Sequence, residues 1–440
     1  MKQKETFVLF YEKSGTDISL SDSDLKQGLI KALEEASPKN NTEKVLVIPP
    51  DITRLHSKAG ELTLAARDYY GKKLTDIMPA LGTHSPMSEE EIEEMFPRID
   101  QSLFRVHKWR TDLHTLGIVP ADYIKRISGG ALDFNWPAQV NRLLVEGDFD
   151  LILSIGQVVP HEVIGFANHN KNIFVGTGGS EAIHKSHFLG AVYGMERIMG
   201  HSESPVRKVL NYASEHFAKS LPILYALTVV SPDETGKLHV RGLFVGDSYE
   251  CFDKAAALSQ KVNLTYLEKS LKRVVVYLDP KEFKSTWLGN KSIYRTRMAI
   301  ADGGELIVIA PGLKQFGEDK EIDALIRKYG YSRTCETLEK VKKSDDLKNN
   351  LAAAAHLIHG SSEGRFTITY APGFLTDKEI ESVGYDYADL KEIMDLFRID
   401  HKKNGFHRDK NGEEFYFIQN PALGLWGLRQ TQEPKKKNNE

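Results

Sequence analysis

Short apolar runs alternate with amphipathic segments of helical period along this chain, and this alternation constrains its fold more than any other feature. Residues 44–50 (KVLVIPP) predict a buried strand, and residues 59–70 predict the helix that follows it. The same alternation predicts more elements: strands at residues 7–10, 74–82 and 150–155, and helices at residues 24–36 and 88–95. Such a pattern is typical of helices that pack against a mostly parallel sheet.

A second series of the same kind begins near residue 273. It predicts strands at residues 274–279, 305–312 and 366–373, and helices at residues 323–328 and 338–355. A chain of 440 residues is also longer than the ~150 residues of an average domain. We therefore predict an α/β protein of two domains, each with a mostly parallel sheet flanked by helices. The boundary is expected at residues 268–275: the first domain covers 1–270, which residues 406–440 are candidates to join, and the second covers 271–405.

Composition excludes several classes of protein. The 58 Lys and Arg nearly balance the 61 Asp and Glu, so a dominant basic field for nucleic acid is absent. No run reaches the ~18 apolar residues of a membrane span. Cys251 and Cys335 are the two cysteines, too few for a disulfide scaffold or a thiolate cage. We expect a cytoplasmic protein with no nucleic-acid or membrane partner.

Polar side chains follow three of the predicted strands in the first domain. Residues 51–54 (DITR), 82–87 (GTHSPM) and 156–161 (GQVVPH) occupy these places. Because ligands of open α/β sheets bind at the carboxyl ends of strands, the three segments are candidates for one site. Taken singly, each has an ordinary explanation as an exposed loop or a helix cap. Their coincidence favours a site.

The residue types at these strand ends suit acid–base chemistry on an anion. Histidine titrates near neutrality, so His84 and His161 could take and return a proton. The Arg54 guanidinium and the backbone N–H groups of a turn suit a carboxylate or phosphate. Further along, His184 and His187 are spaced i,i+3 on a predicted helix, on one face of it. That pair could bind a metal or could simply lie on the helix surface.

The ordered set DITR (51–54), GTHSPM (82–87), VPHEVIGF (159–166), Lys171 and His187 resembles the lactate racemase family. Members of that family are nickel-dependent and use a pincer cofactor. The similarity covers most of the first domain, and the two-domain layout also looks alike. The motifs are specific jointly, because none would identify the family alone.

The resemblance implies a role for each matching residue. Lys171 would tether pyridinium-3-thioamide-5-thiocarboxylic acid mononucleotide, the nickel-pincer nucleotide, through a thioamide. His187 would bind nickel, and His84 and His161 would be the catalytic acid–base pair. The segment that holds the cofactor would consist of Asp51, Ile52, Thr53 and Arg54. The active site would lie in the interdomain cleft, the substrate would be a small 2-hydroxy acid, and the cofactor-biosynthesis enzymes would be transient partners.

Departures from the family pattern bear on the substrate. Asn168 and His169 stand where members often have a Gly-Gly pair, and Leu55 and Ser85 replace a proline and an arginine. In the second domain, Arg295 is a candidate cofactor contact and Arg297 a candidate substrate contact. Asn168, His169, Asn170 and Arg297 could hydrogen-bond a polyhydroxylated acid, and Arg54 could anchor the substrate carboxylate. Since a site built to bond hydroxyls rejects substrates that lack them, we predict that C2 of a sugar acid such as an aldonate, rather than of lactate, is inverted.

Two other functions remain open from the residues. A divalent-metal-dependent hydrolase could use His184 and His187, with Glu181 one turn earlier as a third ligand. A non-catalytic sugar-acid binding protein with hinged domains would bind the same ligand without turnover.

Overall fold

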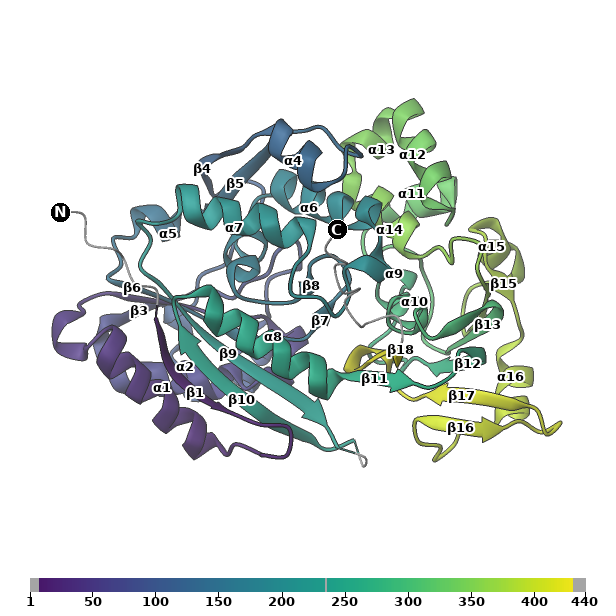
Figure 1. Ribbon diagram of the computed structural model, residues 1–440, viewed down its shortest axis with the longest axis horizontal. Helices are drawn as coiled ribbons and strands as arrows, with labels where there is room; N and C mark the ends of the chain where they lie inside the picture. The colour runs from purple at the N-terminus through teal and green to yellow at the C-terminus, as the bar shows by residue number, and fades with distance from the viewer. Residues whose placement is uncertain (1–7, 234–235, 430–440) are drawn as a thin grey trace, which may run out of the picture. The chain divides into compact units, whose positions relative to one another are not determined.

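The computed structural model describes residues 8–233 and 236–429, and the chain divides into two compact units. The first unit comprises residues 1–193 and 197–263, and the second comprises residues 194–196 and 264–440. Each unit contains a six-stranded sheet with helices packed against it (Figure 1). The predicted α/β class, with mostly parallel sheets in two regions of the chain, is confirmed.

The first unit is built on a sheet of order β1-β10-β9-β6-β2-β3. The strands of the first unit, inside and outside this sheet, are β1 (Leu9–Ser14), β2 (Val45–Ile48), β3 (Leu74–Ile77), β4 (Leu113–Val119), β5 (Trp136–Asn141), β6 (Leu151–Gln157), β7 (Pro160–His161), β8 (Gly165–Phe166), β9 (Ile223–Pro232) and β10 (Leu238–Gly246). Its α-helices are α1 (Asp22–Ala36), α2 (Ala59–Tyr70), α3 (Glu89–Met95), α4 (Ala121–Ile127), α5 (Leu143–Glu146), α6 (Ser180–Tyr193), α7 (Pro205–Phe217) and α8 (Tyr249–Asn263). Short helical turns are η1 (Lys39–Asn41), η2 (Ile52–Ser57), η3 (Gly71–Lys73), η4 (Gln101–Leu103), the π-helical η5 (Asn172–Gly176) and, across the division between the units, η6 (Met195–Arg197).

The central strands of this sheet are parallel, and its β1 side is antiparallel. Strands β3, β2, β6 and β9 pair in parallel, whereas β10 runs antiparallel to both β9 and β1. β2 and β6 are buried at every residue, as expected of strands covered on both faces. The antiparallel pair β9 and β10 was not predicted from the sequence.

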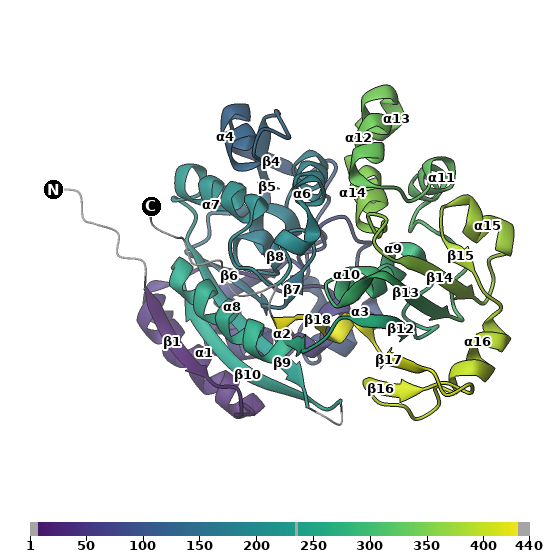
Figure 2. The same ribbon diagram turned by 45° about the vertical axis from the view of Figure 1, so that its right-hand side comes forward.

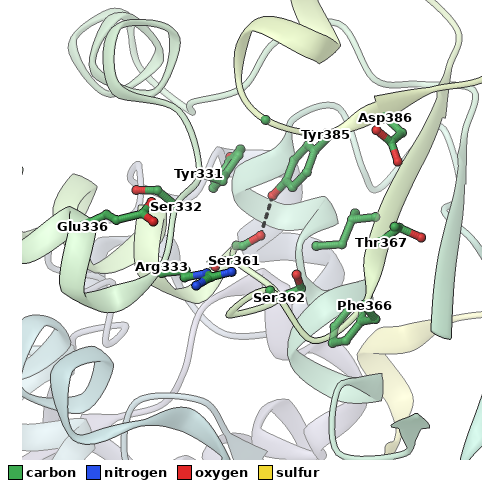
Figure 3. A pocket seen from close by; sticks show the side chains of 14 residues that line it. Tyr331, Ser332, Arg333, Glu336, Ser361, Ser362, Phe366, Thr367, Tyr385 and Asp386 are labelled. Carbon is green, nitrogen blue, oxygen red and sulfur yellow. Dashed lines mark hydrogen bonds between the residues drawn. The ribbon is translucent and has the colours of Figure 1, made fainter. Parts of the chain in front are cut away.

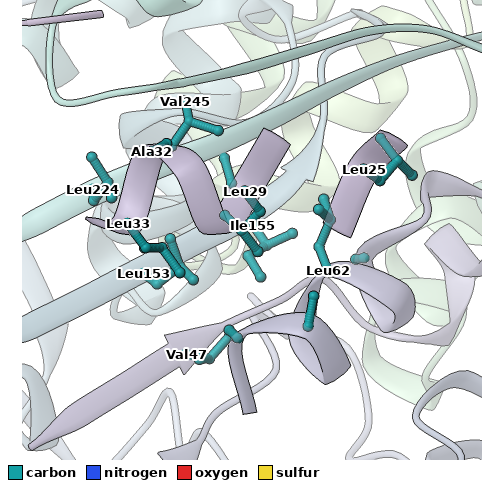
Figure 4. Packing of buried hydrophobic residues seen from close by; sticks show 14 of the residues in the cluster. Leu25, Leu29, Ala32, Leu33, Val47, Leu62, Leu153, Ile155, Leu224 and Val245 are labelled. Carbon is teal, nitrogen blue, oxygen red and sulfur yellow. The ribbon is translucent and has the colours of Figure 1, made fainter. Parts of the chain in front are cut away.

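The main core of the first unit lies between this sheet and helices α1 and α2. Leu25, Leu29, Ala32 and Leu33 of α1 pack against the sheet and against Leu62 of α2, and all five are essentially inaccessible to solvent (Figure 4). Burying a leucine side chain contributes about 1.5–3 kcal/mol, so this helix face is a major source of stability.

Helix α8 covers the other face of the same sheet (Figure 2). Leu243 and Val245 of β10 belong to the core under α1. Gly242 and Gly246, at alternate positions of the same strand, face α8, because a Cβ at Gly242 would meet Leu258 and one at Gly246 would meet Cys251. The sheet is therefore a layer between two helical layers, which leaves the ends of its strands to form a site.

The second unit has a sheet of order β15-β14-β13-β12-β17-β16, parallel except for β16. Its strands are β11 (Leu264–Leu267), β12 (Leu271–Tyr277), β13 (Ile300–Ala310), β14 (Thr367–Pro372), β15 (Asp386–Tyr387), β16 (Gly405–Arg408), β17 (Glu414–Ile418) and β18 (Leu425–Leu428). Its helices are α9 (Thr286–Gly289), α10 (Lys291–Thr296), α11 (Lys320–Tyr329), α12 (Thr334–Lys343), α13 (Asp345–Asn349), α14 (Leu351–His359), α15 (Asp377–Ser382), α16 (Leu390–Phe397) and the short η7 (Pro421–Leu423). Among the described residues, no helix is both long enough and apolar enough to span a membrane.

Three predicted elements need correction. The single helix predicted at residues 338–355 is wrong, because the chain forms α12, α13 and α14 there. Ser344 and Asn350 have non-helical backbone angles, and the Asn350 side chain accepts a hydrogen bond from the Ala353 N–H at 3.0 Å, which begins a new helix. The strand predicted at 74–82 ends at Ile77, and the strand predicted at 7–10 is β1, with residue 7 outside the described residues.

Candidate active site

The carboxyl ends of the parallel strands in the first unit bring two loops together. An isolated parallel bridge joins Pro50 to Ala80 and extends the pairing of β2 with β3. Just beyond it, the Gly82 N–H donates to the carbonyl oxygen of Gly176 at 2.8 Å. Gly82 has φ +57°, a conformation that glycine adopts without strain. The loop that carries His84 is thereby fixed to the turn η5, which follows Lys171.

Asp51 and His84 form a hydrogen-bonded pair at this edge. Asp51 is 4% exposed, and its carboxylate accepts hydrogen bonds from Thr53 Oγ1 at 2.5 Å and from His84 Nδ1 at 2.6 Å. Burial alone would raise the pKa of Asp51, but these bonds and the His84 and Arg54 charges outweigh it, so the pKa is lowered. Because an ionised carboxylate can only accept, His84 donates from Nδ1. When the ring is neutral, its Nε2 keeps a lone pair that can take a proton.

His161 has the opposite arrangement of protons. It lies in the small hairpin β7–β8, and its Nδ1 accepts a hydrogen bond from the Val163 N–H at 3.1 Å. The neutral ring therefore carries its proton on Nε2. Burial lowers the pKa of His161 well below its ordinary value, and the nearby charges of Lys171 and His187 lower it further. At neutral pH, His161 is a neutral ring that can donate from Nε2.

Lys171 lies immediately before η5, whose position is fixed by Asn172. The Asn172 side chain donates to the Ile48 carbonyl at 3.1 Å and to Ser154 Oγ at 3.0 Å, which ties the turn to β2 and β6. Turns of π-helical form are often found at functional sites. Burial and the adjacent Arg54 charge lower the pKa of Lys171 to about 8, so a substantial fraction of its amine is neutral near physiological pH.

His187 on α6 is suited to bind a metal as a single ligand. Its Nδ1 donates to the Ile183 carbonyl at 2.8 Å, which leaves the Nε2 lone pair available. Burial lowers the pKa of His187 to about 4, so the ring is neutral at physiological pH, as a ligand must be. Lys171 is among the charged groups that influence this pKa.

These predicted residues form one cluster together with a carboxylate that was not predicted. Glu162 Oε2 lies 3.8 Å from His161 Nδ1. Its charge raises the pKa of Arg54, His161, Lys171 and His187 against the lowering effect of burial. Groups that influence one another in this way lie near each other. Glu162 stands within the motif at residues 159–166, so its position beside His161 was a usable signal.

Asn168 and His169, which were predicted to contact substrate, are held by contacts within the protein. The buried Arg207 guanidinium donates to the carbonyls of Phe166 and Asn168 and to the side chain of Asn170. The His169 ring is 2% exposed and lies against Tyr225, with ring centroids 3.9 Å apart. Both Asn168 and His169 have positive φ, a conformation that is uncommon for residues other than glycine. Nothing near Arg207 in the sequence signals this role.

The other predicted contacts fall into two groups. Ile52 is partly buried and packs against the core of the first unit, so its side chain supports the loop. Arg295 and Arg297 belong to α10 and its end in the second unit and are 3% and 2% exposed. The Arg297 guanidinium donates to Glu196 at 2.6 Å and to the Ser361 carbonyl at 3.0 Å, both within the same unit.

The protein side chains do not supply a complete metal site. Over residues 8–233 and 236–429, no group of three or more His, Cys, Asp or Glu is placed to hold a metal ion. Glu181, the third ligand of the hydrolase alternative, pairs with Lys185 instead. The structure therefore does not support that alternative. A square-planar nickel ion could take one imidazole from His187 only if a cofactor supplied the remaining donors, and the neutral amine of Lys171 suits a covalent tether for such a group.

Comparison with known proteins gives a match over the part of the chain that carries these residues. Residues 29–198 match the family model described as the lactate racemase N-terminal domain. This part of the chain is therefore lactate racemase-like. The matched segment contains Asp51, Arg54, His84, His161, Lys171 and His187, so every residue of the cluster lies in it.

Individual relatives of this lactate racemase-like chain are distant. A lactate racemase from Thermoanaerobacterium thermosaccharolyticum is 24% identical over 252 residues, which cover 53% of this chain and 51% of that protein. The chain thus matches about half the length of this curated relative. A crystal structure of a protein from Thermotoga maritima is similar with a TM-score of 0.79 at 25% identity, covering 95% of this chain and 100% of that one.

The fold also matches a solved lactate racemase. The lactate racemase apoprotein from Thermoanaerobacterium thermosaccharolyticum gives a TM-score of 0.70 at 17% identity and covers 94% of each chain. At this identity the similarity shows a shared fold. The predicted family is therefore confirmed by the family model and the curated relative, and the predicted fold by the solved structure.

Proposed function

We propose that this protein is a racemase or epimerase that inverts C2 of a 2-hydroxy acid. The observation that carries the proposal is the complementary proton arrangement of His84 and His161, in a cluster with Lys171 and His187. The reaction requires a base for the hydroxyl proton and a hydrogen-bond donor to the same oxygen, and Nε2 of His84 and the Nε2–H of His161 suit these two roles.

Each residue has a step that its contacts support. His84 Nε2 takes the proton of the substrate hydroxyl, and Asp51 stabilises the imidazolium that forms. The Arg54 guanidinium binds the substrate carboxylate. His161 donates a hydrogen bond from Nε2 to the same oxygen and keeps its proton, because a neutral ring that lost it would become an imidazolate. His84 returns the proton to that oxygen when the product forms, and the configuration at C2 is set by the face on which the C–H bond is remade.

The hydride at C2 requires a cofactor that the resemblance implies. Lys171 would tether a nickel-pincer nucleotide and His187 would bind its nickel, and this group would supply the hydride-transfer chemistry that inversion at C2 needs. Attachment of that group would make the cofactor-biosynthesis enzymes transient partners of the chain.

A sugar acid remains the proposed substrate, with a changed structural argument. The Asn168 carbonyl is bonded by Arg207, His169 lies against Tyr225, and Arg297 bonds Glu196. Glu162 supports the preference instead, because a carboxylate beside His161 can accept hydrogen bonds from hydroxyls beyond C2. Lactate has no hydroxyl beyond C2 to fill that position.

The test uses protein produced together with the cofactor pathway. Intact-mass spectrometry should show a covalent addition to the wild-type chain and none to Lys171→Ala. NMR should then show inversion at C2 of gluconate, with Glu162→Gln losing more activity on gluconate than on lactate. Inversion of lactate alone would overturn the sugar-acid preference. Gluconate binding without turnover, unaffected by His84→Ala and His161→Ala, would instead show a binding protein.

A further inference from the structure

A polar pocket in the second unit lies outside the cluster described above. Its volume is about 340 Å³, and it is enclosed by the turn at Tyr331–Glu336, the loop at Gly360–Gly364 with the start of β14, and the start of β15 (Figure 3). Pockets of this size hold small molecules. None of its lining residues belongs to the acid–base cluster, so it is a separate feature of the chain.

Charged groups of opposite sign face this pocket without partners. The Arg333 guanidinium lies against Gly364 and extends towards Ser361 and Ser362 (Figure 3). Asp386 is on the opposite side of the pocket. Within the part of the chain that the structure describes, neither the Arg333 guanidinium nor the Asp386 carboxylate makes a hydrogen bond or ion pair. A ligand that carries an anion at one end and hydrogen-bond donors at the other would satisfy both groups.

Hydroxyl groups line the space between these charges. Ser332, Ser361, Ser362 and Thr367 all border the pocket. Hydroxyls can both donate and accept, which suits a ligand that carries several hydroxyls itself. The aromatic floor, where Tyr331 and Tyr385 stack with centroids 4.5 Å apart, is buried.

The loop that supplies Ser361 and Ser362 is held rigidly. The Glu363 carboxylate accepts hydrogen bonds from the Thr334 N–H and from Thr334 Oγ1, at 2.9 and 2.7 Å. The Gly360 carbonyl accepts a bond from the Tyr385 hydroxyl at 2.9 Å, and the Glu363 N–H donates to Ser361 Oγ at 2.9 Å. A loop held in this way loses little entropy when a ligand binds.

We propose that this pocket binds a small polyhydroxylated carboxylic acid, with its carboxylate on Arg333 and its far hydroxyls on Asp386 and the pocket serines. The proposal goes beyond the catalytic function, because it assigns a second ligand site to the chain. It does not depend on turnover, since it concerns residues of the second unit alone.

Isothermal titration of the full-length chain, purified without cofactor, tests the proposal with three probes. Gluconate carries both the carboxylate and the hydroxyls, sorbitol carries the hydroxyls alone, and inorganic phosphate supplies an anion alone. Gluconate should bind, and Arg333→Ala should weaken that binding about ten- to a hundred-fold. Asp386→Asn should weaken gluconate binding and leave any phosphate binding unchanged. Lys320→Ala, which removes an exposed positive charge elsewhere in the same unit, is the matched control and should bind gluconate as wild type does.

Arg54→Ala separates this pocket from the catalytic cluster. The proposal predicts that Arg54→Ala retains the gluconate binding that Arg333→Ala loses. Loss of the same binding event in both variants would show a single substrate site and overturn the proposal. Absence of saturable gluconate binding to wild type, binding unaffected by Arg333→Ala, or equally tight binding of sorbitol or phosphate would also overturn it. Failure of the proposed catalytic function would appear separately, as absent turnover in loaded enzyme with this binding intact.

Discussion

Replacing Asp51 with asparagine tests the proton arrangement of the active-site cluster. The substituted amide keeps the shape of the side chain and can still accept the bond from His84 Nδ1, but it carries no charge. A hydrogen bond to a charged partner contributes about 1.5–3 kcal/mol, against about 0.5–1.5 kcal/mol for a neutral one. The charged hydrogen bond stabilises His84 while it holds the substrate proton and is positively charged. Losing the charge on residue 51 therefore raises the barrier of the proton-transfer step.

The expected magnitude follows from the exposure of His84. Its side chain is 58% exposed, so water screens part of the interaction with Asp51. We therefore take the lower part of the difference, about 1 kcal/mol, which corresponds to a fall in kcat/KM of roughly five- to ten-fold. NMR of the C2 epimers, with cofactor-loaded enzyme, measures this in both directions. The two directions must fall by the same factor, because the substitution cannot change the equilibrium between the epimers.

Asp76→Asn is the matched control for this substitution. Asp76 is a buried carboxylate in β3 of the same sheet, and it pairs with Arg105 Nε at 2.7 Å rather than with the cluster. Its replacement should reduce stability and leave kcat/KM unchanged. Wild-type kcat/KM in a folded Asp51→Asn variant, or an equal loss in Asp76→Asn, would refute the role of the Asp51–His84 pair.

Three further predictions follow from the buried groups. Lys171, whose pKa is lowered to about 8, should react with cyanate half-maximally near that pH, below the ~10.4 of an exposed lysine, as peptide mass mapping would show. His187 has a pKa of about 4 in the folded chain, so the unfolded chain binds its proton first as pH falls. The wild-type free energy of unfolding should therefore fall as pH drops from about 6.5 towards 4. Urea unfolding of His187→Gln should show a smaller fall over the same range. Arg207→Ala should lower the free energy of unfolding by at least about 3 kcal/mol, because three buried acceptors lose their donor. In the same urea titration, the control Lys208→Ala on the same helix should change it by less than about 0.5 kcal/mol.

Local sequence signals predicted the parts of the fold that depend on local physics. The helix at 59–70 was predicted with its observed bounds, and the helix at 88–95 begins at a capping box in which Ser88 and Glu91 bond each other's backbone. Strand β9 was not predicted, although it is a largely buried apolar run like those that indicated β2 and β6. Its pairing with β10 and the pairing of β10 with β1 are long-range contacts that a local period does not encode.

The strand-end rule grouped the residues from which the candidate site is built. Asp51, His84 and His161 follow strands whose ends meet, so their grouping could be predicted from position alone. The backbone conformation at Asn168 could not be predicted, because its carbonyl is bonded by Arg207, which lies 39 residues later. A contact between residues so far apart leaves no local signal in the sequence.

The proton positions on the two histidines were also beyond the sequence, and they have a consequence for turnover. In the proposed reaction, His84 Nε2 takes the hydroxyl proton and returns it, whereas His161 keeps its proton and donates a hydrogen bond from Nε2. His84, with a side chain 58% exposed, can exchange the proton that it holds with water. His161 has a side chain only 12% exposed, and its Nδ1 is occupied by the Val163 N–H. The two imidazoles therefore have different tasks, because a carboxylate holds Nδ1 of one ring and a backbone N–H holds Nδ1 of the other.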